Sequence, residues 1–165
     1  MTTKEVLLEQ FNTCYDQNGW FVAVKNAVHN LSARDACCKP ENADNSIWGI
    51  LAHLNFYNER YLKRFKGETL ESLELENSET FAGAENVSEV EWRREVERFD
   101  SVMSEWRKLI EAAEDSRFDE PVSETNKSLW GTLIADINAH NAYHGGQIVL
   151  IRKLAGNWDN SAGVS

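Results

Sequence analysis

The chain has 165 residues and a formal net charge of −10 at pH 7, with 42% hydrophobic and 27% charged residues. This length suits one domain, residues 1–165, that buries most of its apolar surface without disulfide bonds. The acidic balance argues against nucleic acid, whose binders carry basic patches, and against docking on an anionic membrane. We therefore expect a globular protein that binds neither nucleic acid nor membranes.

Cysteine usage and hydropathy predict a cytoplasmic location. The three cysteines are an odd number and two are adjacent, which makes a poor disulfide framework: Cys14, Cys37 and Cys38. No apolar run approaches the ~20 residues that a membrane helix needs. No apolar signal core follows the first residues, Met1-Thr2-Thr3-Lys4-Glu5. We expect reduced thiols and an intracellular protein.

Apolar residues that recur every three or four positions predict four long helices. These helices are expected at residues 3–28, 46–66, 88–114 and 128–155. The second begins at a suitable N-cap, Ser46, and stops before Gly67. The third begins with the capping-box pair Ser88 and Glu91, and the fourth stops at Gly156.

The connection between the second and third helices, residues 66–87, is long, acidic and polar. A connection of this length is unusual in a compact domain and predicts a crossover along the molecule. Such a crossover leaves the second and third helices parallel. The expected fold is therefore all-α, an up-down-down-up four-helix bundle with a long crossover between helices 2 and 3.

The fourth helix carries the strongest chemical signal. Its apolar stripe is interrupted by three successive polar positions, His140, His144 and Gln147. Burying imidazoles costs a few kcal/mol unless they find partners. Two histidines at i and i+4 lie about 6 Å apart on one helix face and can reach a single ion. Zinc proteases with this spacing carry Glu after the first His, where this chain has Asn141, so a protease is excluded.

His53, on the second helix, is the expected third ligand. It lies about 10 Å from the start of its helix, and His144 lies about 16 Å from the end of the fourth, at ~1.5 Å per residue. The two histidines lie at the same level along the bundle, within about a turn, only if the two helices are antiparallel, as the crossover predicts. Three protein ligands and one open position are typical of catalytic zinc-type sites. The alternative for His53 is a packed, hydrogen-bonded core histidine.

Two parts of the chain resemble the DinB-like metalloprotein family. The second helix of that family resembles two segments of this chain, Leu51-Ala52-His53-Leu54 and Glu59-Arg60-Tyr61-Leu62. The signature of the family's fourth helix resembles the segment His140-Asn141-Ala142-Tyr143-His144-Gly145-Gly146-Gln147-Ile148. The resemblance implies an up-down-down-up bundle, a zinc or nickel ion on His53, His140 and His144, and a homodimer. The family often has Arg where this chain has Gly145, so no role of that Arg is expected here.

Further polar and aromatic residues are candidates for the surroundings of the ion. Gln147 is placed to orient a ligand histidine or a bound water, or else to be a buried amide tied to another helix. Asn18 would line a pocket or mark a packing irregularity in the first helix. Tyr57 and Tyr143, and Tyr61 as well, would supply a phenol near the ion or fill the core.

An open position on a three-histidine ion can hold water or a thiolate and lowers the pKa of either. Some members of the family that the chain resembles are transferases that use small thiols. We therefore expect a metal-dependent enzyme of the thiol S-transferase type, with a small thiol and an electrophile as substrates. Arg60, Arg152 and Lys153 are available for the carboxylates of the thiol. The sequence assigns no catalytic acid or base.

Three alternatives stay open at this point. The first is a metal-dependent hydrolase, weakened because no Asp or Glu stands inside the ligand motif. The second is a metal-binding or stress-response protein without turnover. The third is a structural bundle whose histidines only form hydrogen bonds.

Overall fold

The computed structural model describes residues 1–41, 43–70, 75–82 and 88–163. The regular secondary structure of these residues is helical, and their one β-type contact is an isolated bridge between Pro121 and Leu129. The α-helices are α1 (Thr3–Tyr15), α2 (Val24–Ala27), α3 (Ala33–Cys37), α4 (Ile47–Phe65), α5 (Glu89–Ala112) and α6 (Trp130–Leu154). Short 3₁₀ helices follow at η1 (Asn77–Phe81), η2 (Asp115–Asp119) and η3 (Asn160–Ala162). The all-α prediction is confirmed, and none of the described helices is long and apolar enough to cross a bilayer.

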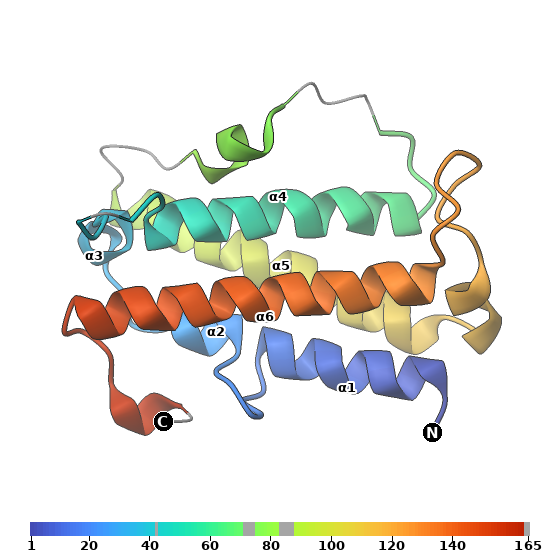
Figure 1. Cartoon of the computed structure of the whole chain (residues 1–165), viewed down its shortest axis with the longest axis horizontal. Coiled ribbons are helices and arrows are strands. Elements are labelled where there is room, and N and C mark those ends of the chain that lie inside the picture. Colours follow the sequence, from blue (N-terminus) through green and yellow to red (C-terminus); the bar gives the residue numbers. More distant parts are fainter. Residues whose placement is uncertain (42, 71–74, 83–87, 164–165) are drawn as a thin grey trace.

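The four long helices lie side by side around one apolar core (Figure 1). Helix α4 packs against α5 and α6, and α1 packs against the same two helices. In Figure 1, α1 and α6 run in one direction, whereas α4 and α5 run in the other. The end of α4 and the start of α5 therefore lie at opposite ends of the molecule, and η1, in the connection between them, packs against α4.

Local capping explains where the long helices begin. The Ser46 hydroxyl accepts a hydrogen bond from the backbone N–H of Gly49 at 3.1 Å, so α4 starts where predicted. The predicted capping box of Ser88 and Glu91 is present at the start of α5. Helix α6 begins at Trp130, two residues after the predicted start, and no side chain caps it.

The prediction of one continuous helix over residues 3–28 is wrong. Helix α1 ends at Tyr15 and α2 begins only at Val24. Asn18 organises the break, because its Oδ1 accepts hydrogen bonds from the backbone N–H of Ala23 at 3.0 Å and from Asn26 Nδ2 at 2.8 Å. Asn side chains that bond to the nearby backbone compete with helical hydrogen bonds in this way.

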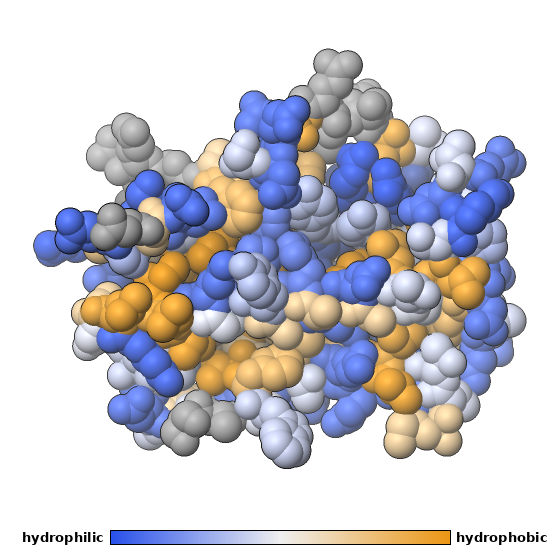
Figure 2. Space-filling model, in the orientation of Figure 1, coloured by the Kyte–Doolittle hydropathy of each residue, from blue (hydrophilic) through white to orange (hydrophobic). Residues whose placement is uncertain are grey.

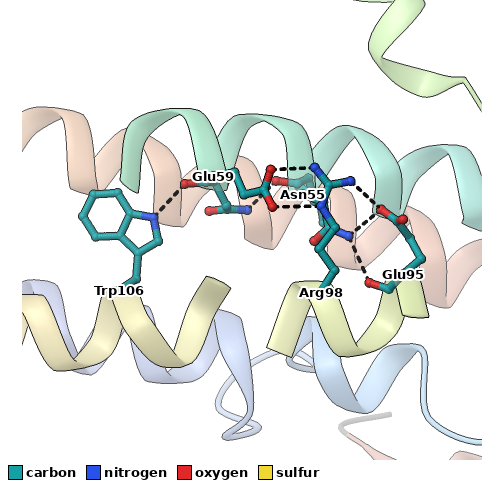
Figure 3. A network of polar contacts seen from close by, with 7 residues as sticks. Asn55, Glu59, Glu95, Arg98 and Trp106 are labelled. Atoms are coloured by element: carbon teal, nitrogen blue, oxygen red, sulfur yellow. Dashed lines mark hydrogen bonds and ion pairs between the residues drawn. The ribbon is translucent and has the colours of Figure 1, made fainter. Parts of the chain in front are cut away.

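Polar contacts between α4 and α5 line one seam of the core (Figure 3). Asn55, which is fully buried, donates from Nδ2 to the backbone carbonyl of Glu95 at 3.0 Å and to its carboxylate at 2.6 Å. Arg98 forms a bidentate ion pair with Glu59, with N···O distances of 2.9 and 2.6 Å. Bidentate pairs add geometric specificity, so these contacts align the two parallel helices.

A second set of contacts joins α4 to α6. Asn58 and Asn141 exchange two side-chain hydrogen bonds, of 2.8 and 3.1 Å, and both residues are buried. The Trp106 indole of α5 donates to the backbone carbonyl of Asn58 at 2.9 Å (Figure 3). Buried amides are costly without partners. The pair is therefore satisfied only at one register of α4 against α6.

Arg152 has a structural role that its charge did not predict. Its guanidinium is buried near the end of α6 and donates to the backbone carbonyls of Ala27 at 2.7 Å, His29 at 3.0 Å and Asn157 at 3.0 Å. These bonds satisfy carbonyls at the C-terminal end of α2, at Ala27 and His29, and just after α6. The expectation that Arg152 is available for a substrate carboxylate is wrong.

Replacing Arg152 with Met should lower the free energy of unfolding by about 3 kcal/mol, because buried carbonyls would lose charge-assisted hydrogen bonds. The measurement is urea denaturation followed by circular dichroism. The matched control is Lys153→Met, since Lys153 is exposed on the same turn and its change should be nearly neutral. Equal stability of the two variants would contradict the role assigned to Arg152.

Candidate metal centre

Three imidazoles converge between α4 and α6. His53 comes from α4, and His140 and His144 come from successive turns of α6. One nitrogen of each lies within 4.8 Å of the others, and Nε2 of His53 is 2.9 Å from Nε2 of His140. The register is set by Asn58, five residues after His53, and by Asn141, the residue after His140, and it brings the two helix faces together at this depth.

The spacing of these nitrogens fits one divalent ion. Nitrogen ligands at ~2.1 Å in a tetrahedral site lie about 3.4 Å from one another, and ligand atoms that all lie within 4.8 Å of one another can reach such an ion with small adjustments. Among the residues that the structure describes, the group able to hold an ion consists of His53, His140 and His144 alone. An ion held by three imidazoles would have a further position for water or a substrate atom.

Thr80, from η1, sets the tautomer of His53. The Thr80 hydroxyl lies 2.6 Å from His53 Nδ1 and donates its proton to the backbone carbonyl of Asn77, also at 2.6 Å. Since the hydroxyl proton is already used, His53 Nδ1–H must be the donor to Thr80. The other ring nitrogen, Nε2, therefore presents its lone pair toward His140. Outer partners of this kind orient metal-binding histidines.

Phe81 covers the ring of His53. The two rings are stacked, with centroids 3.9 Å apart and planes 11° from parallel. Helix α4 makes room for this segment at Gly49, where an added Cβ would lie 2.7 Å from the backbone oxygen of Phe81. The close approach of η1 to α4 thus depends on the missing side chain at Gly49.

Gln147 and Tyr143 surround the third imidazole. His144 Nδ1 is 2.7 Å from Gln147 Oε1, and Gln147 Nε2 donates to the Tyr143 hydroxyl at 3.1 Å. A carbonyl oxygen can only accept, so His144 carries its proton on Nδ1 and its Nε2 lone pair is free. The exposed Tyr143 ring also packs edge-on against His144, with centroids 5.0 Å apart.

Tyr57 lies at the site, whereas Asn18 is used elsewhere. The Tyr57 ring is 4.9 Å from that of His53 and 5.6 Å from that of His140, and its hydroxyl donates to Asn77 Oδ1 at 3.0 Å. Asn18 instead holds the turn between α1 and α2 and donates to the carbonyl of Ala162. Its hydrogen bonds involve none of the three histidines.

Burial keeps the three imidazoles neutral at pH 7. Desolvation, followed by repulsion from His144 and His140, lowers the pKa of His53 to about 3. Desolvation and His144 lower the pKa of His140 to about 4. Burial also lowers the pKa of His144, although the bond to Gln147 opposes that shift. Neutral imidazole is the form that binds metal ions, so no ligand proton has to be displaced near neutral pH.

Thr80 and Phe81 were not predicted from the sequence. Both belong to the long connection, which has no apolar period that would place its residues against a helix face. The nearest signal was Gly49 in the first turn of α4, since a glycine in a helix can admit a close neighbour.

The sequence profile of the DinB superfamily matches residues 23–148, which include all three histidines. The chain therefore belongs to the DinB superfamily, as the resemblance of its second and fourth helical segments predicted. No curated protein and no solved structure matches the chain significantly.

The contact at Gly49 can be tested against a glycine with free space around it. Gly146→Ala should raise the free energy of unfolding by about 0.5–1 kcal/mol, because Ala favours helix and nothing lies within 4 Å of its Cβ. Gly49→Ala should instead lower it by about 1–3 kcal/mol, because the methyl group meets the Phe81 carbonyl. Thermal and urea unfolding of both metal-free variants give the comparison, and a stabilising Gly49→Ala would show that η1 does not dock as described.

Thr80→Val should weaken zinc binding by about tenfold to a hundredfold, the usual effect of removing an outer partner of a ligand histidine. Thr80→Ser keeps the hydroxyl and should bind zinc nearly as the wild type does. Competition with a chromogenic chelator measures both dissociation constants. Equal weakening in the two variants would mean that the methyl group of Thr80, and not its hydrogen bond, supports the site.

Proposed function

We propose that the protein is a metal-dependent enzyme that transfers a small thiol to an electrophile at the three-histidine site. The observation that carries the proposal is the convergence of His53, His140 and His144 as neutral nitrogen ligands, in a group that includes no Cys, Asp, Glu or further His among the described residues. A bound zinc or nickel ion would lower the pKa of a thiol and supply a nucleophile at neutral pH.

The residues of the chain have separate tasks in this proposal. Thr80 and Gln147 hold the outer nitrogens of His53 and His144, so that the lone pairs already point inward before an ion arrives. Phe81 shields His53 from water on one ring face. Such preorganisation favours the reactive geometry, because the site does not have to rearrange as charge develops.

The proposal also covers the topology of the bundle, the location of the protein and its oligomeric state. We take the arrangement of α1, α4, α5 and α6 to be the up-down-down-up four-helix bundle implied by the family, in a cytoplasmic homodimer. Exposed apolar side chains near the end of α6, Leu150 and Leu154, support a protein contact there. Figure 2 shows hydrophobic surface gathered over that end of the helix.

The first test is metal content, measured by mass spectrometry on untagged protein. The wild type should hold about one divalent ion per chain, and His144→Ala should lose it, because two imidazoles remain where three are needed. The matched control is His29→Ala, since His29 is exposed and outside the cluster. Absence of metal in all three proteins, even after reconstitution with zinc or nickel, would contradict the proposal.

A second measurement separates the transferase from a protein that only binds metal. Cysteine and chlorodinitrobenzene serve as thiol and electrophile: the S–C bond forms, chloride leaves and the thiol proton passes to solvent. Saturable conjugation that requires metal and is lost in His144→Ala would support the transferase. Metal binding without any metal-dependent conjugation of cysteine or other small thiols would favour the non-catalytic alternative.

A further inference from the structure

A cleft of about 320 Å³ lies directly beside the metal centre and shares one of its residues, His140. Its walls come from α4, α6 and η1. The lining residues are Tyr57, Asn58, Tyr61, Asn77, Leu133, Asp136, Ile137 and His140. The volume lies at the lower end of the range for small-molecule pockets, so the cleft suits a ligand of one ring and a short chain.

The walls of the cleft are largely apolar and aromatic. The Tyr57 and Tyr61 rings lie near parallel, 21° apart with centroids at 6.5 Å, and the side chains of Leu133 and Ile137 line it from α6. Tyr57 is held in place by its hydrogen bond to Asn77. Parallel tyrosine rings present faces that attract both apolar groups and cations.

One tyrosine of the cleft, Tyr61, already makes a cation–π contact within the chain. The guanidinium of Arg64 lies 5.4 Å from the centroid of the Tyr61 ring, although Arg64 does not line the cleft. The contact shows that the chain itself places a positive group over the Tyr61 ring at cation–π distance.

The charge of the cleft has one sign. Asp136 is the only charged residue among the described lining residues, and it forms no ion pair with any residue that the structure describes. It stands four residues before His140 on α6, so the two side chains lie about 6 Å apart on one helix face. Asp136 is exposed, so it is a solvent-accessible carboxylate on the wall of a cleft that also carries two tyrosine rings, and such a wall favours a cation over a carboxylate.

We infer that this cleft binds the second substrate of the enzyme, and that this substrate carries a protonated amine on an apolar or aromatic body. That the ligand is a substrate rests on the proposed function, whereas the binding of an amine depends on the cleft alone. Asp136 pairs with the ammonium group, and the tyrosine rings and the α6 side chains hold the apolar body. His140, which the cleft shares with the three-histidine group, places the ligand beside the metal centre.

The test is binding of phenethylamine, followed through the ¹³C methyl signal of Ile137, in metal-free and in zinc-loaded protein. Ile110, fully buried in the core, is the internal reference that should not move. Phenethylamine should shift the Ile137 signal in a saturable manner in both forms. Phenylpropionate, similar in size and opposite in charge, should bind at least about tenfold more weakly, as expected for losing a charge-assisted contact.

Asp136→Asn should weaken phenethylamine binding by about tenfold or more, and should remove most of the preference over phenylpropionate. The matched control is Glu97→Gln, an equal change of charge at an exposed position of α5, which should leave binding unchanged. Equal binding of amine and acid, unchanged binding in Asp136→Asn, or no shift at Ile137 would each overturn the inference. Amine binding in a protein that takes up no metal would overturn the proposed function while supporting the amine site.

Discussion

The reciprocal amide pair of Asn58 and Asn141 is the constraint on which the site depends. Both side chains are buried between α4 and α6, and each supplies the donor that the other needs. A slip of one helical turn, about 5.4 Å, would leave both amides unpaired in the core and would carry His53 away from His140. Apolar packing tolerates such slips more readily than paired polar groups do, so two asparagines maintain the alignment of the three histidines.

The metal centre is also supported from outside its ligand shell. Two of the three imidazoles are fixed by partners on their outer nitrogens, Thr80 for His53 and Gln147 for His144. Burial alone would make these rings a cost to the fold, because desolvated imidazoles need hydrogen-bond partners. The same two bonds therefore stabilise the fold and select the tautomers of His53 and His144 whose Nε2 lone pairs face the centre of the site.

The elements that follow simple periodicity were predictable from the sequence, and those that depend on distant contacts were not. The caps at Ser46 and Ser88 located α4 and α5, and the polar gap in the stripe of α6 located two histidines of the site. The break after α1 was missed because apolar residues continue the helical period beyond Asn18. Arg152 was assigned to substrate from its charge, since the carbonyl groups that surround it come together only in the folded chain. Thr80 lies in a connection without any period.

Segment η1 contacts the histidines, although it lies outside the four long helices. Its contribution to the core is small, since Thr80 is the only buried residue within it. Separate stretches of the chain therefore supply two sets of residues. One set keeps the helices folded, and the other forms one wall of the metal centre and of the neighbouring cleft. Substitutions in η1 can therefore change that wall, and with it the ligand that binds, without changing the residues that pack the four long helices.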